Sequence, residues 1–215
     1  RRHTRSGPQS RGLGDVYKRQ EQTGDPIYRD IAFSHAGTTM ENHFRPDNSS
    51  WHVIDYDTIT GEVRNRNTHQ GYADESSWAR GQAWGLYGYT MSYRLTDHMA
   101  FLKQAERIAG FLLEHPRLPE DLLPYWDFDA PGIPDEPRDV SAAAIMASAL
   151  YELCRYSENG AYYKAAADRM MESLGSTYAS APGENYGFIL GHSVGHKPVE
   201  SEVDVPLNYA DNYSL

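Results

Sequence analysis

The stretch HQGYADESSWARGQAW, from His69 to Trp84, is the most informative part of this 215-residue sequence. It places two tryptophans, an arginine, two glutamines and a histidine within sixteen residues. Indole faces stack on the C–H faces of a sugar ring, and a guanidinium holds a carboxylate through two parallel hydrogen bonds. Amide and imidazole groups can hydrogen-bond hydroxyls as donors or acceptors. The stretch therefore indicates a site for an anionic sugar.

The spacing within this stretch also predicts a helix. If the helix begins near Ser77, then Arg80, Trp84 and Tyr87 fall on one face at i, i+4 and i+7. The competing interpretation is a core helix whose tryptophans fill volume and whose arginine pairs with a carboxylate of the protein. The polar approach at residues 68–71, Thr-His-Gln-Gly, is hard to explain by packing and favours a binding site.

The start of this helix is expected to form part of the pocket. Trp78 precedes Arg80 by two residues, so it can reach the same pocket only from the first turn or from the entering loop. Asp74 and Ser76 are the candidate N-caps, because their side-chain oxygens can accept hydrogen bonds from the first amide groups.

The composition suits a wet, hydrogen-bonding cleft. Hydrophobic residues make up 40% of the sequence, and tyrosine (16 copies) outnumbers phenylalanine (6 copies). The 20 Lys and Arg residues against 30 Asp and Glu residues give a net charge of −10. This balance argues against a nucleic-acid partner, because it implies no phosphate-neutralising surface. An acidic protein that binds an acidic ligand needs a local cation, and Arg80 is the candidate.

Cys154 is the only cysteine, so the sequence allows no intrachain disulfide and no cysteine-based metal site. It lies in an apolar helical run and is expected to be an inert core thiol. No apolar run reaches membrane-spanning length, and the first residues lack the apolar region of a secretory signal. We expect a soluble bacterial protein, cytoplasmic or periplasmic, without a membrane partner.

Residues 1–20 differ from the rest of the chain. They contain six Lys or Arg residues and one acidic residue, with no hydrophobic period of either kind. Their ending, GLGDVYKRQ, is similar to translated library-adapter sequence, and we expect this tail to be non-native and without defined structure. A basic arm for nucleic acid or membrane is the alternative. Residues 21–215 are expected to form the folded domain.

Five further helices are predicted from hydrophobic periodicity and capping residues. The first begins at Asp25-Pro26, with proline in its first turn, and its inner stripe is expected to consist of Tyr28, Ile31, Ala32 and His35. The other four run from the Asp97 cap to about His115, from Asp139 or Ser141 to about Tyr156, from the Asn159 cap to about Tyr178, and onward from about Pro206.

Between the helices, residues 51–66 alternate in polarity and turn at Thr60-Gly61, which predicts a small β-hairpin. Residues 118–138 form a loop rich in proline and acidic residues, and residues 183–202 are expected to be irregular. The helix after Asp97 has the clearest core face, made of Phe101, Leu102, Ala105, Ile108, Ala109 and Leu112.

Helical hairpins that alternate with polar loops are typical of an α/α toroid. The sequence predicts six helices, whereas a closed ring of helical hairpins in two layers needs about twelve. We therefore predict an all-α fold, namely an incomplete (α/α)6 toroid of about half the ring with a small β-hairpin insertion. The other half of the ring is expected to precede Gln22.

Motifs in four places carry a family resemblance. They are HAGTTMENHFRPDNSSWHVIDYDTITGEV, HQGYADESSWARGQAWGLYGY, YWDFDAP followed by RDVSAAAI, and GHSVGHKP with DVPLNYADNYSL. Together they resemble glycoside hydrolase family 88, the unsaturated glucuronyl hydrolases, over about residues 23–215. The resemblance implies an (α/α)6 barrel that removes a 4,5-unsaturated uronic acid from oligosaccharides released by polysaccharide lyases.

The resemblance also implies a mechanism. Instead of attacking the anomeric carbon with two carboxylates, such an enzyme hydrates the C4=C5 vinyl ether. An aspartic acid protonates C4 and helps to deliver water to C5, after which the hemiketal opens and the glycosidic bond breaks. Neither a metal nor an organic cofactor is implied, and the expected partner is a uronate-terminated unsaturated oligosaccharide.

Seven residues match substrate-binding positions of the family. Arg80 matches the cation that faces the uronate, Trp78 and Trp84 match sugar-stacking tryptophans, His52 matches the histidine near the reacting ring, Gln70 matches a substrate contact, and His69 and Trp126 are assigned to the pocket rim. All of these roles are implied by the resemblance.

The match fails at the general acid/base. The family carries this aspartate in a D-x-x-M-N-L-P-like segment, and counting back from His52 by the family's spacing leads to the region of Pro8, where no such motif occurs. Asp15 is nearby but lacks that context. A second active-site aspartate of the family is also absent. We assign no catalytic residue and expect the chain to be inactive as written.

Two other functions remain open. A related unsaturated rhamnogalacturonyl hydrolase would have the same fold with a different aglycone. A non-catalytic carbohydrate-binding toroid is the second alternative, because helical toroids also serve as scaffolds.

Two further constellations have simpler explanations than chemistry. Asp127 and Asp129 are close carboxylates in an aromatic loop, where such residues usually serve turns and caps. His192 and His196 have the i, i+4 spacing of metal ligands but lack the adjoining glutamate, and the glycines and proline around them argue against a helix. We interpret their segment as a loop that closes over the barrel mouth.

Overall fold

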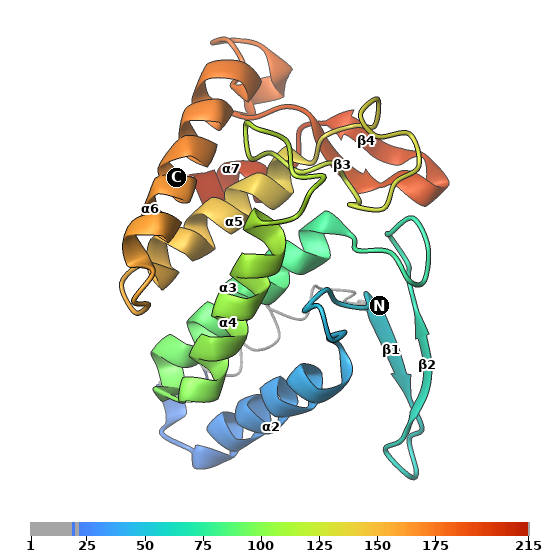
Figure 1. Ribbon diagram of the computed structural model, residues 1–215, viewed down its shortest axis with the longest axis vertical. Coiled ribbons are helices and arrows are strands. Elements are labelled where there is room, and N and C mark those ends of the chain that lie inside the picture. Colours follow the sequence, from blue (N-terminus) through green and yellow to red (C-terminus); the bar gives the residue numbers. More distant parts are fainter. Residues whose placement is uncertain (1–18, 20–21, 215) are drawn as a thin grey trace.

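A computed structural model describes residue 19 and residues 22–214 of the chain. In this part, six α-helices and two β-hairpins follow one another (Figure 1). The helices are α2 (Pro26–Asn42), α3 (Ala79–Thr96), α4 (Met99–Leu113), α5 (Val140–Leu153), α6 (Gly160–Ser173) and α7 (Asn208–Ser214). The strands are β1 (Val53–Tyr56), β2 (Val63–Asn67), β3 (Ser193–His196) and β4 (Ser201–Val205). The predicted tail at residues 1–20 lies almost wholly outside the described residues.

Helix α5 is the centre of the helical core. Its sequence, VSAAAIMASALYEL, is apolar on nearly every side, and eleven of its fourteen residues are buried. The helix packs against α3, α6 and α7 (Figure 1). Alanines allow these helices to approach closely, while Ile145, Met146 and Leu150 fill the spaces between them. Its N-cap is Asp139, one of the two predicted caps, whose side chain accepts a hydrogen bond from the amide of Ser141.

Helix α4 shows the clearest agreement with the expected periodicity. All six residues of the predicted core face are buried. The cap was wrong, however, because Asp97 has a left-handed φ of 54° and ends α3, and His98 occupies the N-cap position of α4. Within residues 22–214, none of the helices combines the length and apolarity needed to cross a membrane.

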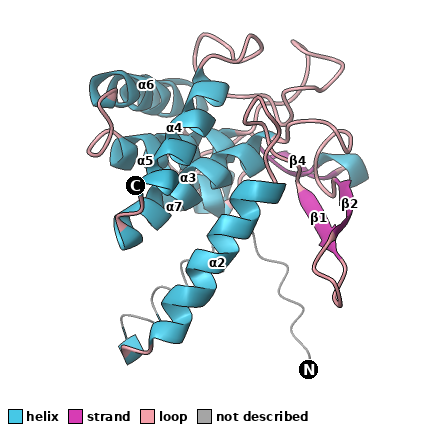
Figure 2. Ribbon diagram, turned by 60° about the horizontal axis from the view of Figure 1, so that its bottom comes forward, coloured by secondary structure: helices cyan, strands magenta, loops and turns pink. Residues whose placement is uncertain are grey.

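Helix α2 begins as predicted but buries a different face. Asp25 caps it by accepting a hydrogen bond from the amide of Ile27, and Pro26 stands in the first turn. Ala32 and Ala36 are its buried residues, whereas Ile31 is 52% exposed. Of the predicted inner stripe, Ala32 is buried and Tyr28 is half-buried, whereas Ile31 and His35 are exposed. α2 lies at the edge of the helical group (Figure 2), where small residues let it lie against α3.

The two hairpins lie beside one end of the helical group (Figure 1). The predicted hairpin is confirmed, with Val53 of β1 opposite Asn67 of β2 and a turn at Gly61, whose φ is 76°. The second hairpin, β3–β4, was not predicted: part of residues 183–202, which were expected to be irregular, is extended, and the helix-rich fold carries two small hairpins where one was expected. Left-handed residues and a bulge interrupt its alternation, so its sequence lacks a strand pattern.

We expect Leu150→Ala to lower the free energy of unfolding by about 2–5 kcal/mol, because the substitution leaves a cavity where α5 meets its neighbours. Denaturant titration followed by circular dichroism measures the change. Met99→Ala is the matched control, because the Met99 side chain is 52% exposed and its loss should change stability by less than about 0.5 kcal/mol. Equal effects of the two substitutions would contradict α5 as the core.

Candidate functional site

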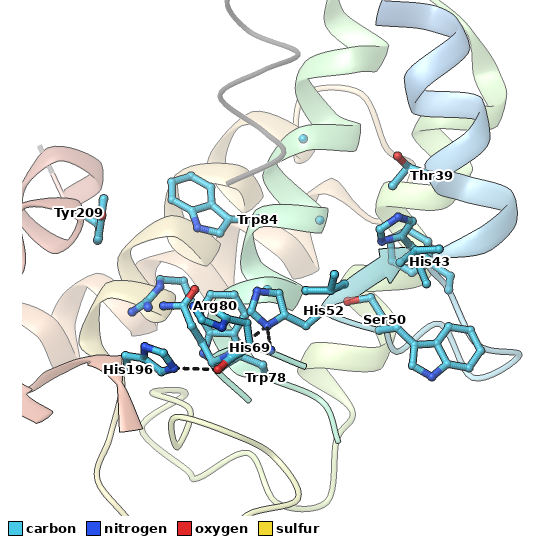
Figure 3. Close-up of a pocket in the computed structure, with 18 of the residues that line it drawn as sticks. Thr39, His43, Ser50, His52, His69, Trp78, Arg80, Trp84, His196 and Tyr209 are labelled. Carbon is cyan, nitrogen blue, oxygen red and sulfur yellow. Dashed lines mark hydrogen bonds between the residues drawn. The ribbon is translucent and has the colours of Figure 1, made fainter. Parts of the chain in front are cut away.

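A cavity of about 620 Å³ lies between α3, α2, the two hairpins and the start of α7. Figure 3 shows His52, Trp78 and Arg80 close together at one end, Trp84 further along α3, and Thr39 and His43 at the other end. The cavity wall includes six of the seven residues that the sequence singled out, namely His52, His69, Gln70, Trp78, Arg80 and Trp84.

Trp78 rather than Asp74 or Ser76 occupies the N-cap position of α3, and no side chain caps the helix there. The two polar residues serve the preceding loop instead. Asp74 accepts a hydrogen bond from the amide of Thr68 (2.9 Å), and the Ser76 hydroxyl donates to Asp127 (2.7 Å). The prediction of these caps was therefore wrong, and α3 begins two residues later than expected. Trp78 enters the cavity from the turn before the helix, as its spacing required.

Asp127 holds this entering loop in place. Its carboxylate is fully buried and accepts hydrogen bonds from the amides of Tyr72 and Asp129 (2.9 Å each) and from the Ser76 hydroxyl. Asp129 in turn accepts from the amide of Ser77 (2.8 Å). Burial raises the pKa of Asp127. The interpretation of this pair as turn and capping groups is confirmed.

Arg80 forms a buried ion pair with Asp139. Its Nη1 lies 3.1 Å from Oδ2 of Asp139, and the two side chains are only 4% and 0% exposed. The same Nη1 donates to the hydroxyl of Ser141 (3.2 Å) and to the carbonyl of Val194, while Nη2 donates to the carbonyl of Gly195 (2.7 Å). Both terminal nitrogens thus bond to protein acceptors. The sequence left open whether this arginine faces a ligand or pairs with a carboxylate of the protein, and the geometry is that of the second interpretation.

The same contacts tie strand β3 to the helices. The Gly195 carbonyl accepts a second hydrogen bond from the Gln70 side-chain Nε2 (2.7 Å). Because Gln70 uses its amino group in this way, its carbonyl oxygen remains as the acceptor that it can offer to a ligand. One backbone oxygen therefore fixes the orientation of two cavity-lining side chains.

The indole of Trp78 packs against both neighbouring polar side chains. The Arg80 guanidinium carbon lies 4.8 Å from the indole centroid, a cation–π distance. The His52 ring lies 4.4 Å from it at an interplanar angle of 32°. Trp84 makes edge-to-face contacts with Tyr87 and Tyr213. Both tryptophans are less than a tenth exposed, so each presents only part of its surface to the cavity.

His52 is a neutral imidazole with a fixed tautomer. Its Nδ1 accepts hydrogen bonds from the backbone amides of His69 (3.1 Å) and Gln70 (3.2 Å), so the ring proton is on Nε2. Burial lowers the pKa of His52 to about 4, and the nearby His69 and Arg80 contribute to the same shift. The ring therefore offers a hydrogen-bond donor at Nε2.

His196 lines the cavity from a segment that was expected to close over the barrel mouth, although no binding role was predicted for it. It ends β3, and its Nε2 donates to the carbonyl of His69 (2.7 Å) while the two rings lie 4.6 Å apart (Figure 3). His192 points elsewhere and pairs with Asp204. In residues 22–214, no three His, Cys, Asp or Glu side chains group as metal ligands.

Trp126 does not line the cavity, contrary to its assignment to the rim. It is 4% exposed, packs behind Trp78, and donates from Nε1 to Glu136 (2.8 Å). Its carbonyl accepts the amide of Ala79 (3.1 Å), the first residue of α3. The loop of residues 118–138 folds beneath the start of the helix, so Trp126 supports the site from behind.

No family model matches the sequence, but individual relatives do. The chain is 48% identical over 200 residues to an unsaturated glucuronyl hydrolase of Formosa agariphila, a match that covers 93% of this chain and 50% of the relative. It is 35% identical over 199 residues to an unsaturated chondroitin disaccharide hydrolase of Streptococcus pneumoniae, covering 91% of this chain and 50% of the relative. The chain thus spans about half the length of these curated relatives.

Solved structures of the same class superpose closely on this chain. A crystal structure of an unsaturated glucuronyl hydrolase specific for heparin matches with a TM-score of 0.93 and 51% identity, over 94% of this chain and 55% of that one. The enzyme from Bacillus sp. GL1 matches with a TM-score of 0.87 and 33% identity, over 94% and 54%. The fold is thus the helix-rich fold of this class of hydrolases. The chain belongs to the unsaturated glucuronyl hydrolases, glycoside hydrolase family 88.

Removing either partner of the Arg80–Asp139 pair should be strongly destabilising, because the remaining charge is buried without compensation. We expect Arg80→Met and Asp139→Asn each to lower the free energy of unfolding by about 3–5 kcal/mol. The double variant should lower the free energy of unfolding by clearly less than the sum of the two single decreases. Denaturant unfolding of all four proteins gives the coupling energy, and additive effects would contradict a coupled pair.

His43 and His52 should make the protein less stable in acid. Burial lowers both pKa values to about 4, below the value of 6.5 expected on unfolding. The unfolded state therefore binds protons first, and this stability is present above pH 6.5 and lost as the pH falls towards 4. We expect His43→Gln to reduce this acid-induced loss in the free energy of unfolding by about 1–2 kcal/mol. NMR titration showing either imidazole protonated at pH 6.5 would contradict the assignment.

Proposed function

We propose that the cavity binds the unsaturated uronate end of an oligosaccharide released by a polysaccharide lyase. The observation that supports this most strongly is the cavity itself, because six side chains suited to an anionic sugar converge on it from three separate segments. The ligands named for two structural neighbours support the same class of substrate: dGlcA-GalNAc6S for one and dGlcA-Glc-Rha-Glc for the other.

Each polar group at the cavity has a distinct role in this proposal. Arg80 supplies positive charge through the wall, although its terminal nitrogens also hold Asp139 and β3. His52 donates from Nε2 and Gln70 accepts at its amide oxygen, so a sugar hydroxyl can be read in both senses. Trp78 and Trp84 provide the apolar surface for the ring, and His69 also lines the cavity.

We further propose that the parent activity is hydration of the C4=C5 double bond, and that these residues bind and orient the sugar for it. The matched position of the general acid/base lies near Pro8, outside the described residues, and the sequence there lacks the family's aspartate segment. Residues 22–214 then correspond to part of an (α/α)6 toroid that holds the sugar-binding wall. In this proposal the chain binds ligand without turning it over.

Isothermal titration calorimetry with an unsaturated glucuronyl disaccharide tests the proposal. We expect binding by the unchanged chain, and a loss of affinity of roughly tenfold for Trp84→Ala, because an aromatic–sugar contact is removed. We also expect the ultraviolet absorbance of the double bond to stay constant during incubation.

Two comparisons make the result decisive. The saturated disaccharide should bind more weakly, since its ring is not flattened by the double bond. Tyr162→Ala, at a side chain 51% exposed and remote from the cavity, should leave affinity unchanged. Absence of binding would overturn the proposed function, and loss of absorbance would overturn the proposed lack of turnover.

A further inference from the structure

Arg66 of β2 is a half-buried arginine without an anionic partner. The other buried or half-buried arginines of the described residues are Arg45, Arg80 and Arg138, and each of them pairs with a carboxylate. Arg66 pairs with none of the described acidic side chains, and its Nε is buried without a hydrogen-bond partner among these residues. Because an unpaired buried donor costs free energy, this position indicates an acceptor that the described residues do not supply.

The Arg66 side chain lies at the wall of the cavity. It is paired across the hairpin with Ile54, so the two side chains share one face, and its guanidinium carbon lies 4.6 Å from the centroid of the Trp51 indole. Ile54, Trp51 and His43 all line the cavity. Burial lowers the pKa of His43 to about 4, and the charges of His35 and Arg66 contribute to the shift. The guanidinium is therefore close to any group that is bound at this part of the cavity.

Arg66 is not needed to hold the indole on which it stacks. Arg45 also lies against Trp51, with its guanidinium carbon 4.5 Å from the ring centroid. All three guanidinium nitrogens of Arg45 donate hydrogen bonds to oxygen atoms of the protein. The Trp51 Nε1 donates to Glu75 (3.1 Å). The indole is thus fixed by a saturated arginine and a carboxylate, which leaves the hydrogen-bonding groups of Arg66 for a ligand.

A second donor without a partner lies close to Arg66. The Tyr56 hydroxyl of β1 is buried and has no hydrogen-bond partner among the described residues. Its ring lies 6.5 Å from the ring of His43. Burial raises the pKa of Tyr56, and the nearby charge of Arg66 opposes the rise. The hydroxyl is therefore protonated at neutral pH and can donate a hydrogen bond.

We propose that Arg66 and Tyr56 form a second anion site, which binds the carboxylate of a further uronate along the same oligosaccharide. The two oxygens of a carboxylate can accept from a guanidinium and a hydroxyl together. Figure 3 places Arg80 at one end of the cavity and His43 at the other, so the two cations serve different parts of a ligand. The inference rests on the proposed function, because the first uronate is bound at the Arg80 end.

Calorimetry with the unsulfated unsaturated disaccharide and tetrasaccharide of hyaluronan tests the inference, since only the tetrasaccharide carries a second carboxylate. We expect the unchanged chain to bind the tetrasaccharide more tightly. Arg66→Met should weaken tetrasaccharide binding roughly three- to tenfold, because a charged hydrogen bond is lost at a half-buried site, and should change disaccharide affinity by less than about twofold.

Two further proteins sharpen the test. Arg64→Met is the matched control, because it removes the same charge from the same strand, but Arg64 is 58% exposed and pairs with Asp57 (3.9 Å). Its affinity for the tetrasaccharide should equal that of the unchanged chain. Tyr56→Phe should weaken tetrasaccharide binding without lowering the free energy of unfolding, because the buried hydroxyl has no partner to lose in the free protein.

A control ligand separates charge from length. The tetrasaccharide dGlcA-Glc-Rha-Glc, named for one structural neighbour, has a single carboxylate. Its affinity should not respond to Arg66→Met, because it places a neutral sugar where the second uronate would lie. An equal loss for both tetrasaccharides would show that Arg66 senses length alone and would overturn the proposed anion site.

The outcomes distinguish this inference from the function on which it rests. If the unchanged chain binds none of the ligands, the proposed function fails. If it binds them and Arg66→Met leaves the hyaluronan tetrasaccharide unaffected, the second anion site is overturned while the uronate site stands. Equal losses for the disaccharide and the tetrasaccharide, or equal effects of Arg66→Met and Arg64→Met, would likewise overturn it.

Discussion

The buried ion pair between Arg80 and Asp139 is the interaction on which the rest of the site depends. Asp139 caps α5, Arg80 stands in the first turn of α3, and the same guanidinium holds the carbonyls of Val194 and Gly195 in β3. Three segments that are distant in the sequence therefore meet at one pair of charges. Desolvation makes such a pair expensive unless its remaining hydrogen-bonding groups are satisfied, and the hydroxyl and carbonyl partners meet that need.

This arrangement explains how the cavity can be polar while its lining side chains keep fixed orientations. His52 is held through its Nδ1 by two backbone amides, and Gln70 is held by the carbonyl of Gly195. Each therefore presents one defined group to a ligand, a donor from His52 and an acceptor from Gln70. Side chains that are already oriented lose little conformational freedom on binding, which favours recognition of a small, hydroxyl-rich ring.

The sequence predicted what local patterns encode. The core face of α4, the cap at Asp139 and the β1–β2 turn follow from periodicity and turn chemistry, and the structure confirms them. Six of the candidate residues also meet at one cavity. The role of Asp127 as a turn anchor followed from its place in an aromatic loop.

Long-range contacts account for the predictions that were wrong. Whether Arg80 faces a ligand or an internal carboxylate depends on a residue in another helix, and no local pattern shows this. Trp126 was misplaced because its loop folds under α3. The β3–β4 hairpin, which carries His196, was missed because left-handed residues interrupt the alternation that marks a strand.

The distribution of indoles has an optical consequence. The chain has four tryptophans. Trp51, Trp78 and Trp84 line the cavity, and Trp126 packs directly behind it. The intrinsic emission of this chain therefore originates at the site, with one fluorophore in contact with both an imidazole and a guanidinium. Changes in spectral position or quantum yield report on the cavity itself, without any attached label.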